Sequence, residues 1–196
     1  IRAAKVAFDT PPAAGGPATA CCYVLVTPDG ERTMNTYLGA AQDLSPADID
    51  PARIAASAIV YLEGYLFDRP EAQAAFELAA RLAHDAGRQV ALTLSDLFCV
   101  ERHRDAFRDL VAGHVDILFA NEAEILGLYE VSSFDAAVDA VRADCPLTVI
   151  TRSEAGAVVV TGSETIAVPA FPVDHLVDTT GAGDQFAAGF LFGLSR

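Results

Sequence analysis

The stretch Ala58-Ile-Val-Tyr-Leu62, followed by the alanine-rich run 71–86 and by Val90-Ala-Leu-Thr-Leu94, decides the fold class. The two short apolar runs are typical of buried strands, whereas the run between them carries apolar residues at helical spacing and stops at Gly87. Strand, helix and strand in this order form a βαβ unit, in which the two strands lie parallel in one sheet.

The same alternation continues along the chain. It predicts helices over 101–112, 122–128 and 134–143, strands over 115–120 and 147–150, and a hairpin that joins 157–160 to 165–168. Repeated units of this kind predict an α/β fold, a parallel sheet with helices on both faces. Ligands in such folds collect where the strands end, which here selects Glu63-Gly64, Ser95-Asp96, Asn121-Glu122 and Thr151-Arg152.

The N-terminal region has a different pattern. Two runs of strand-forming residues, 20–26 and 32–38, flank the turn Pro28-Asp29-Gly30 and predict a β-hairpin; a short strand is also predicted over Val6–Phe8. We therefore expect residues 1–40 to form a small β portion and residues 41–196 to form the α/β core, within a single domain.

Composition excludes several classes of function. The 196 residues carry 13 basic and 27 acidic side chains, a net charge of −14, which argues against nucleic acid or a membrane surface as partner. No apolar run reaches the roughly 18 residues of a membrane span. The cysteines show no metal-ligand spacing, so we expect reduced thiols in a cytoplasmic protein; they are Cys21, Cys22, Cys99 and Cys145.

The run Asp178-Thr-Thr-Gly-Ala-Gly-Asp184, followed by a helical stretch from 185 to 194, carries the chemistry. Gly181 and Gly183 allow close approach of the backbone to a ligand, and the first amides of a helix attract anions. A carboxylate repels a phosphate, so the presence of Asp184 beside an anion-binding turn needs an explanation. One chemical explanation is that Asp184 accepts the proton of a hydroxyl that attacks a phosphoryl group. The alternative is a helix cap after a glycine-rich loop.

With Gly189 five residues further on, this segment resembles the C-terminal signature of the ribokinase-like (PfkB) family of sugar and nucleoside kinases. The resemblance implies a ribokinase-like core with Asp184 as catalytic base and Gly181, Ala182 and Gly183 as the anion hole. The resemblance also implies that the hairpin is a lid that covers the substrate and a surface through which a homodimer forms. The alternative is an ordinary edge hairpin. The N- and C-terminal parts of the family fold are expected to lie outside these 196 residues.

Two further segments match family motifs. Asn121 and Glu124 match the N-x-x-E motif, which implies support of Mg²⁺ through water; the same letters also suit a helix N-cap. Four residues match a nucleotide-binding turn for ATP, namely Thr151, Arg152, Ser153 and Gly156. Arg152 suits phosphate oxygens, but Ser153 replaces the usual first glycine, and a plain polar turn is the alternative.

The residues before the anion hole match a monovalent-cation site. Asp178 is expected to help hold K⁺, with Thr180 beside it and near the nucleotide. Equal turnover in Na⁺ and K⁺ would remove this expectation.

The resemblance therefore predicts transfer of the γ-phosphoryl group of Mg·ATP to a hydroxymethyl group. The stretches 32–39, 61–67, 92–95 and 119–122 are most similar to bacterial adenosine-kinase-like members, which implies the 5′-hydroxyl of adenosine or a related ribonucleoside. Two alternatives stay open: a free sugar such as ribose, fructose or 2-keto-3-deoxygluconate, and a non-catalytic nucleotide-binding relative.

Overall fold

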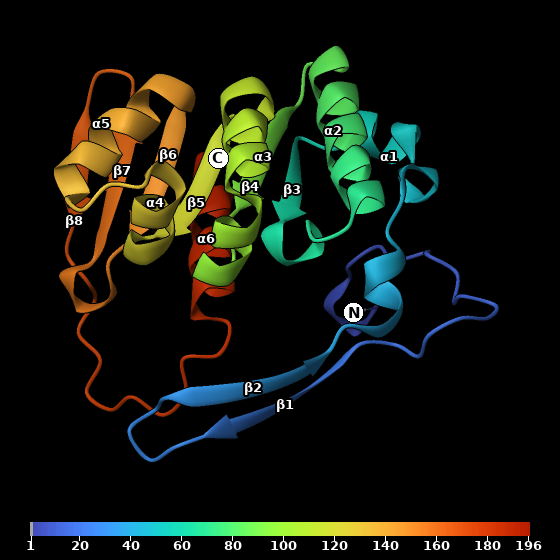
Figure 1. The fold of residues 1–196 in the computed structure, drawn as a ribbon, viewed down its shortest axis with the longest axis horizontal. Coiled ribbons are helices and arrows are strands. Elements are labelled where there is room, and N and C mark those ends of the chain that lie inside the picture. Colours follow the sequence, from blue (N-terminus) through green and yellow to red (C-terminus); the bar gives the residue numbers. More distant parts are fainter. Residues whose placement is uncertain (1) are drawn as a thin grey trace.

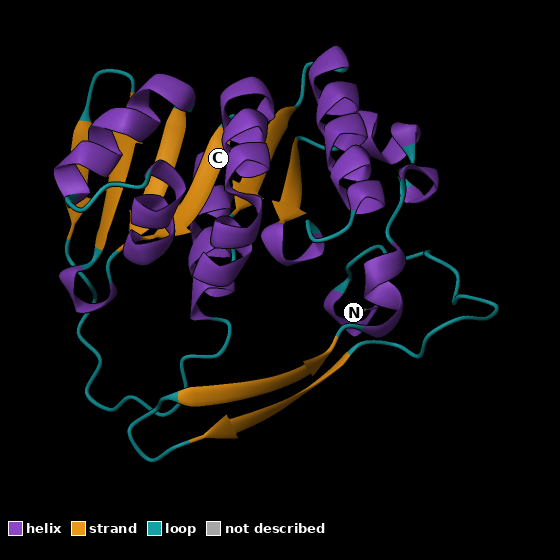
Figure 2. Cartoon of the chain, in the orientation of Figure 1, coloured by secondary structure: helices purple, strands orange, loops and turns teal. Residues whose placement is uncertain are grey.

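The computed structural model describes residues 2–196, which form two separate sheets (Figures 1 and 2). The larger sheet has six strands in the order β3-β4-β5-β6-β7-β8. Four are parallel, β3 (Ile59–Glu63), β4 (Gln89–Thr93), β5 (Ile117–Asn121) and β6 (Leu147–Thr151), and two continue antiparallel, β7 (Ala157–Thr161) and β8 (Thr165–Val168). The predicted fold class is confirmed.

Helices cover both faces of this sheet, but unequally. The described helices are α1 (Pro51–Ala56), α2 (Pro70–Asp85), α3 (Leu97–His114), α4 (Glu122–Tyr129), α5 (Phe134–Asp144) and α6 (Ala182–Leu194), with short 3-10 turns at Arg2–Ala4, Gly39–Asp43, Pro46–Asp48, Gly64–Leu66 and Ser153–Ala155. Helices α2 to α5 pack on one face, and α6 packs alone on the other (Figure 1). No helix within residues 2–196 is both long and apolar enough to cross a membrane.

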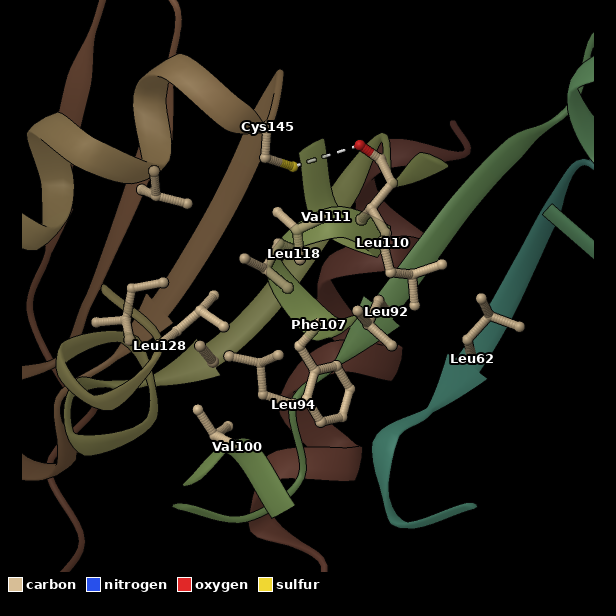
Figure 3. Packing of buried hydrophobic residues seen from close by; sticks show 14 of the residues in the cluster. Leu62, Leu92, Leu94, Val100, Phe107, Leu110, Val111, Leu118, Leu128 and Cys145 are labelled. Carbon is tan, nitrogen blue, oxygen red and sulfur yellow. Dashed lines mark hydrogen bonds between the residues drawn. The ribbon is translucent and has the colours of Figure 1, made fainter. Parts of the chain in front are cut away.

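Alternating residues of the central strands build the two halves of the core. Leu92 and Leu118 point into the cluster under α2 to α5, where Phe107 is fully buried (Figure 3). Ala91 and Phe119 point the other way, toward α6. Burial on both faces explains why these strands are continuous apolar runs.

Side-chain caps explain where several helices begin. The Asp96 carboxylate accepts from the backbone N–H of Phe98 at 2.6 Å and of Cys99 at 3.3 Å, so α3 starts at Leu97, four residues before the predicted start. Helix α1, which the sequence analysis did not predict, begins at Pro51 behind the cap residue Asp50.

The strand predicted over Val6–Phe8 is wrong. These residues carry no regular structure, and Val6 and Phe8 are about half exposed. A strand needs a partner, and the following Pro11-Pro12 pair has no backbone N–H to donate to one.

The smaller sheet is the predicted hairpin, β1 (Cys21–Val26) and β2 (Arg32–Tyr37), which we call the lid hairpin. It lies across the edge at which the parallel strands end (Figure 1). The two sheets share no strand, which supports a boundary near residue 40, and we keep that boundary as a proposal.

Candidate active site

Acidic side chains gather where β3 and β4 end. The Ser95 hydroxyl donates to the carboxylate of Glu63, the last residue of β3. Burial raises the pKa of Glu63, and the charge of Asp184 raises it further. Asp184 lies on α6, so the far end of the chain returns to this edge of the sheet.

Asn121 and Glu124 close on each other at the end of β5. The Asn121 side chain accepts from the Glu124 N–H at 2.9 Å and donates to Glu124 Oε1 at 2.7 Å, while Glu124 Oε2 accepts from the Asn121 N–H at 2.9 Å. The alternative interpretation as a helix cap is therefore confirmed, and the metal role stays a prediction. Burial, with the charges of Asp96 and Glu63, raises the pKa of Glu124 to about 7.

The residues 178–184, which we call the signature loop, bring the Asp184 carboxylate close to Gly181 at the start of α6. Gly181 takes a left-handed conformation, φ 75°, and caps α6. The Ala182 N–H donates to the Thr179 carbonyl at 3.1 Å. The N–H groups of Gly183 and Asp184 lie in the first turn of α6 and therefore have no intrahelical acceptors. A Cβ on Gly181 would lie 3.8 Å from Asp184 Oδ2, so this carboxylate folds back over the start of the helix.

Arg32 is a further candidate site residue, which the sequence did not indicate. From the start of β2, its guanidinium donates to the Thr179 hydroxyl in the signature loop. The pKa of Asp178 is lowered mainly by hydrogen bonds from Thr180, and the charge of Arg32 adds to that effect. Arg32 and Thr179 are 147 residues apart in the sequence, so no local sequence pattern predicts their contact.

The predicted nucleotide-binding turn follows β6, next to Asn121. Strand register places Thr151 opposite Asn121. Arg152 is already engaged: its guanidinium donates to both oxygens of Glu122, at 2.9 and 3.1 Å, and lies 3.9 Å from the Phe134 ring centre. Ser153 adopts φ 48°, a left-handed conformation that favours glycine and explains why its departure from the motif matters.

Gly156 closes the same turn and tolerates no side chain. Its φ is 90°, and a Cβ there would lie 2.1 Å from the Val168 carbonyl oxygen. The turn is therefore held against the strand β8, with Thr151, Ser153 and Gly156 on one short loop.

The residues fit Mg²⁺ only as an ion shared with nucleotide and water. Within residues 2–196, no group of three or more His, Cys, Asp or Glu side chains is arranged to hold a metal. Hard carboxylate oxygens are present, however, and the raised pKa of Glu124 means that a nearby cation would stabilise its charged form. Mg²⁺ commonly binds through phosphates and water with one or two carboxylates.

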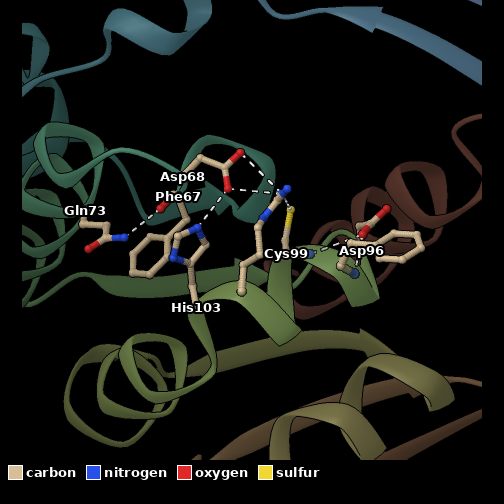
Figure 4. Close-up of polar contacts among 8 residues, drawn as sticks. Phe67, Asp68, Gln73, Asp96, Cys99 and His103 are labelled. Atoms are coloured by element: carbon tan, nitrogen blue, oxygen red, sulfur yellow. Dashed lines mark hydrogen bonds and ion pairs between the residues drawn. The ribbon is translucent and has the colours of Figure 1, made fainter.

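A cleft of about 630 Å³ opens between the lid hairpin and the start of α3. We call it the lid cleft; it is lined by Thr36, Leu38, Tyr65, Asp68, Asp96, Phe98, Cys99, Glu101 and Arg102. Phe98 is 71% exposed and Tyr65 45% exposed, so both rings are accessible beside it. Figure 4 shows the polar contacts along one wall.

Comparisons with known proteins show the family of this chain. The family described as pfkB family carbohydrate kinase matches residues 1–196. An ATP-dependent ribose-1-phosphate kinase from Halopiger xanaduensis is 36% identical over 183 residues, which cover 88% of this chain and 53% of that protein. Aminoimidazole riboside kinase from Salmonella typhimurium is 34% identical over 191 residues, covering 91% and 57%.

Among solved structures, an adenosine kinase from Sinorhizobium meliloti superposes with a TM-score of 0.95 at 51% identity, covering 98% of this chain and 59% of that one. The chain thus spans little more than half the length of these relatives. The family match over the whole chain, together with the fold and the signature loop, shows that the chain belongs to the pfkB family of carbohydrate kinases.

Proposed function

We propose that this chain is the core of an ATP-dependent kinase that phosphorylates the hydroxymethyl group of a ribonucleoside, adenosine first. One observation carries the proposal: the Asp184 carboxylate lies over Gly181, beside the free amides that begin α6. A base and an anion site within one helical turn are what transfer of a phosphoryl group to a hydroxyl requires.

Each residue of the signature loop then has a role. Asp184 accepts the proton of the attacking hydroxyl, and the backbone of Gly181, Ala182 and Gly183 faces the charge on the transferring group. The Ala182 N–H is engaged with Thr179, so Gly183 and Asp184 supply the amides that remain free. Positioning and electrostatics of this kind carry most of the catalysis in phosphoryl transfer.

The nucleotide side of the site is proposed from the motifs. Thr151, Ser153 and Gly156 lie on the turn beside Asn121, and Thr180 lies in the signature loop. Mg²⁺, when bound with the nucleotide, neutralises phosphate charge, and Asn121 and Glu124 would hold it through water. Arg152 would have to leave Glu122 to reach a phosphate. A K⁺ ion at Asp178 stays a prediction.

The lid cleft supports a nucleoside as acceptor. Its volume suits a small molecule, and Phe98 and Tyr65 offer exposed aromatic faces on which a base could stack. The adenosine kinase that is 51% identical supports the same choice. The similarity to a ribose-1-phosphate kinase keeps a sugar or sugar phosphate as the second candidate.

The test is ADP release from Mg·ATP, with adenosine, other nucleosides and sugars offered separately. Asp184→Asn should lower kcat by about 10²–10⁴-fold while the circular dichroism spectrum and Tm stay unchanged. Glu71→Gln, which removes a first-turn carboxylate from α2, is the matched control and should keep full activity. Near-full activity of Asp184→Asn would exclude it as base; ATP binding without turnover of any acceptor would favour a non-catalytic relative.

We further propose a homodimer formed through the lid hairpin. Tyr23, Leu25 and Tyr37 lie on one face of it by strand register, and they are 73%, 66% and 50% exposed. A cytoplasmic location is proposed as well, since all four cysteines are free thiols.

A further inference from the structure

The lid cleft has an uneven charge. Among the described residues that line it, Arg102 is the one basic side chain, against the three carboxylates of Asp68, Asp96 and Glu101. An arginine at the wall of a substrate cleft is the usual means of binding a phosphate, because its planar fork matches phosphate oxygens. Whether Arg102 can serve in that way depends on what already occupies it.

Asp68 occupies it. Arg102 Nη2 lies 3.2 Å from Asp68 Oδ1 and 3.4 Å from Oδ2. The same carboxylate contacts His103 Nε2 at 2.9 Å (Figure 4). Arg102 also donates to Cys99 Sγ at 3.6 Å, so its guanidinium is drawn toward the wall.

The position of Asp68 is fixed by the core behind it. The neighbouring Phe67 is buried, its ring 4.5 Å from that of Phe107 and 5.4 Å from that of Phe76. The Gln73 side chain donates to the Phe67 carbonyl at 2.9 Å. Asp68 therefore projects from an anchored segment, which limits its freedom to release Arg102.

Helix α3 is also distorted at this point. Consecutive residues of a helix do not face one another, yet Arg102 and His103 both reach Asp68. His103 departs from helical geometry, with φ −126° and ψ 27°, where the helix is kinked. The local backbone is arranged so that one carboxylate receives both side chains.

We propose that Asp68 is a specificity-determining residue that neutralises Arg102 and so disfavours acceptors with a phosphate at the end remote from the reacting hydroxyl. This inference rests on the proposed function. Arg32 of the lid hairpin contacts the signature loop, and Thr36 on the same face of the hairpin lines the lid cleft. An acceptor whose hydroxyl lies at Asp184 would therefore extend its other end along this face into the lid cleft. With Arg102 paired, that end meets the carboxylate of Asp96, which caps α3 but is paired with no cationic side chain among the described lining residues, and the carboxylate of Glu101. These charges repel a phosphate of charge about −1.5 to −2 but tolerate a neutral base.

The experiment compares adenosine with ribose 1-phosphate in the protein at its natural length, by equilibrium binding and by kcat/KM. Asp68→Asn keeps an oxygen for His103 but removes the charge that neutralises Arg102. The preference for ribose 1-phosphate over adenosine should rise roughly tenfold, and ribose 1-phosphate binding should then weaken with added salt. Glu130→Gln is the control. Glu130 pairs at 3.1 Å with Arg104, which lies on α3 like Arg102, but neither residue of this pair lines the cleft.

A double-mutant cycle isolates the pair. Arg102→Gln should abolish the gain produced by Asp68→Asn, whereas a gain that persists in the double variant would overturn the proposal. A change below twofold in Asp68→Asn, or a complete lack of binding of both ligands by every variant, would overturn it too. If binding shifts as expected but no acceptor is phosphorylated, the kinase proposal fails, and Asp68 selects among ligands of the lid cleft without selecting an acceptor. If phosphorylation occurs but the preference does not move, the kinase proposal stands and only this one fails.

Discussion

The residues of the candidate site are of two kinds: some lie within short sequence motifs, and others contact partners that are distant in the sequence. Asp184, Asn121 and Glu124 were predictable because each lies within a short motif whose spacing has a physical meaning. Arg32 and the Asp68–Arg102 pair were not, since their partners lie far away in the sequence and only the folded chain brings them together.

Arg32 gives the first prediction at this scale. Arg32→Met removes the lid-borne cation next to the signature loop, and we expect kcat to fall about 10- to 100-fold with a smaller change in the KM for the acceptor, because charge on the transferring group is stabilised mainly in the transition state. Steady-state kinetics measure the split. Arg53→Met, which removes an arginine paired with Asp9 and Asp50, is the control. An unchanged kcat in Arg32→Met would show that the contact only holds the lid.

Glu124 gives a prediction about pH. Its pKa is about 7 in the folded protein against about 4.5 in an unfolded chain, so between these values the folded state binds more protons. The stabilising contribution of Glu124 to the free energy of unfolding is fully present below about pH 4.5, where the side chain is protonated in both states, and it is lost as pH rises through about 7. Urea unfolding at several pH values should show a loss on the order of 1–3 kcal/mol across this window. The slope should flatten in Glu124→Gln; the same slope in both proteins would contradict the assignment.

At the scale of elements, the contact between the ends of β3 and β4 depends on a glycine. A Cβ on Gly64 would lie 2.6 Å from the Thr93 carbonyl oxygen, 2.8 Å from that of Leu94 and 2.9 Å from Ser95 Oγ. Ser95 itself has φ 70°, so this turn cannot relax easily. Gly64→Ala should therefore destabilise the protein by about 1–3 kcal/mol and displace Glu63 from Ser95.

The matched variant is Gly113→Ala in α3, where nothing lies within 4 Å of the added Cβ. It should stabilise the helix by up to about 1 kcal/mol, since alanine is the better helix former. Thermal unfolding of both variants makes the comparison. Equal Tm values for Gly64→Ala and Gly113→Ala would mean that the backbone at the end of β3 shifts to accept the added methyl group without loss of stability.

Which elements the sequence could predict follows from what stabilises them. Strands β4 to β6 are buried on both faces, so their apolar runs mark them directly, whereas β3 buries Val60 and Leu62 on one face and leaves Tyr61 exposed on the other. The start of α3 was placed too late, because the cap at Asp96 lies outside the apolar periodicity. The strand over 6–8 was predicted from a short run of strand-forming residues that ends before Pro11-Pro12, although strand formation requires a partner that these residues lack.

At the scale of the whole molecule, the lid hairpin has two unlike faces. Strand register puts Arg32 and Thr36 on the face that meets the signature loop and the lid cleft. Tyr23, Leu25 and Tyr37 lie on the opposite face, where exposed aromatic and aliphatic side chains have no partner within the described chain. An isolated two-stranded sheet is marginally stable in water, so pairing through this face would stabilise the lid as well as join two copies.

The dimer is tested by sedimentation at micromolar concentration, where we expect the wild-type protein to run as a dimer and Tyr23→Ser/Leu25→Ser as a monomer. Phe171→Ser is the control: Phe171 is 90% exposed but lies outside the hairpin, so its loss should leave the dimer intact. The lid of the monomeric variant loses its support, so the KM for the acceptor should rise with little effect on ATP binding. A wild-type protein that sediments as a monomer would remove the dimer proposal and leave the exposed face for another partner.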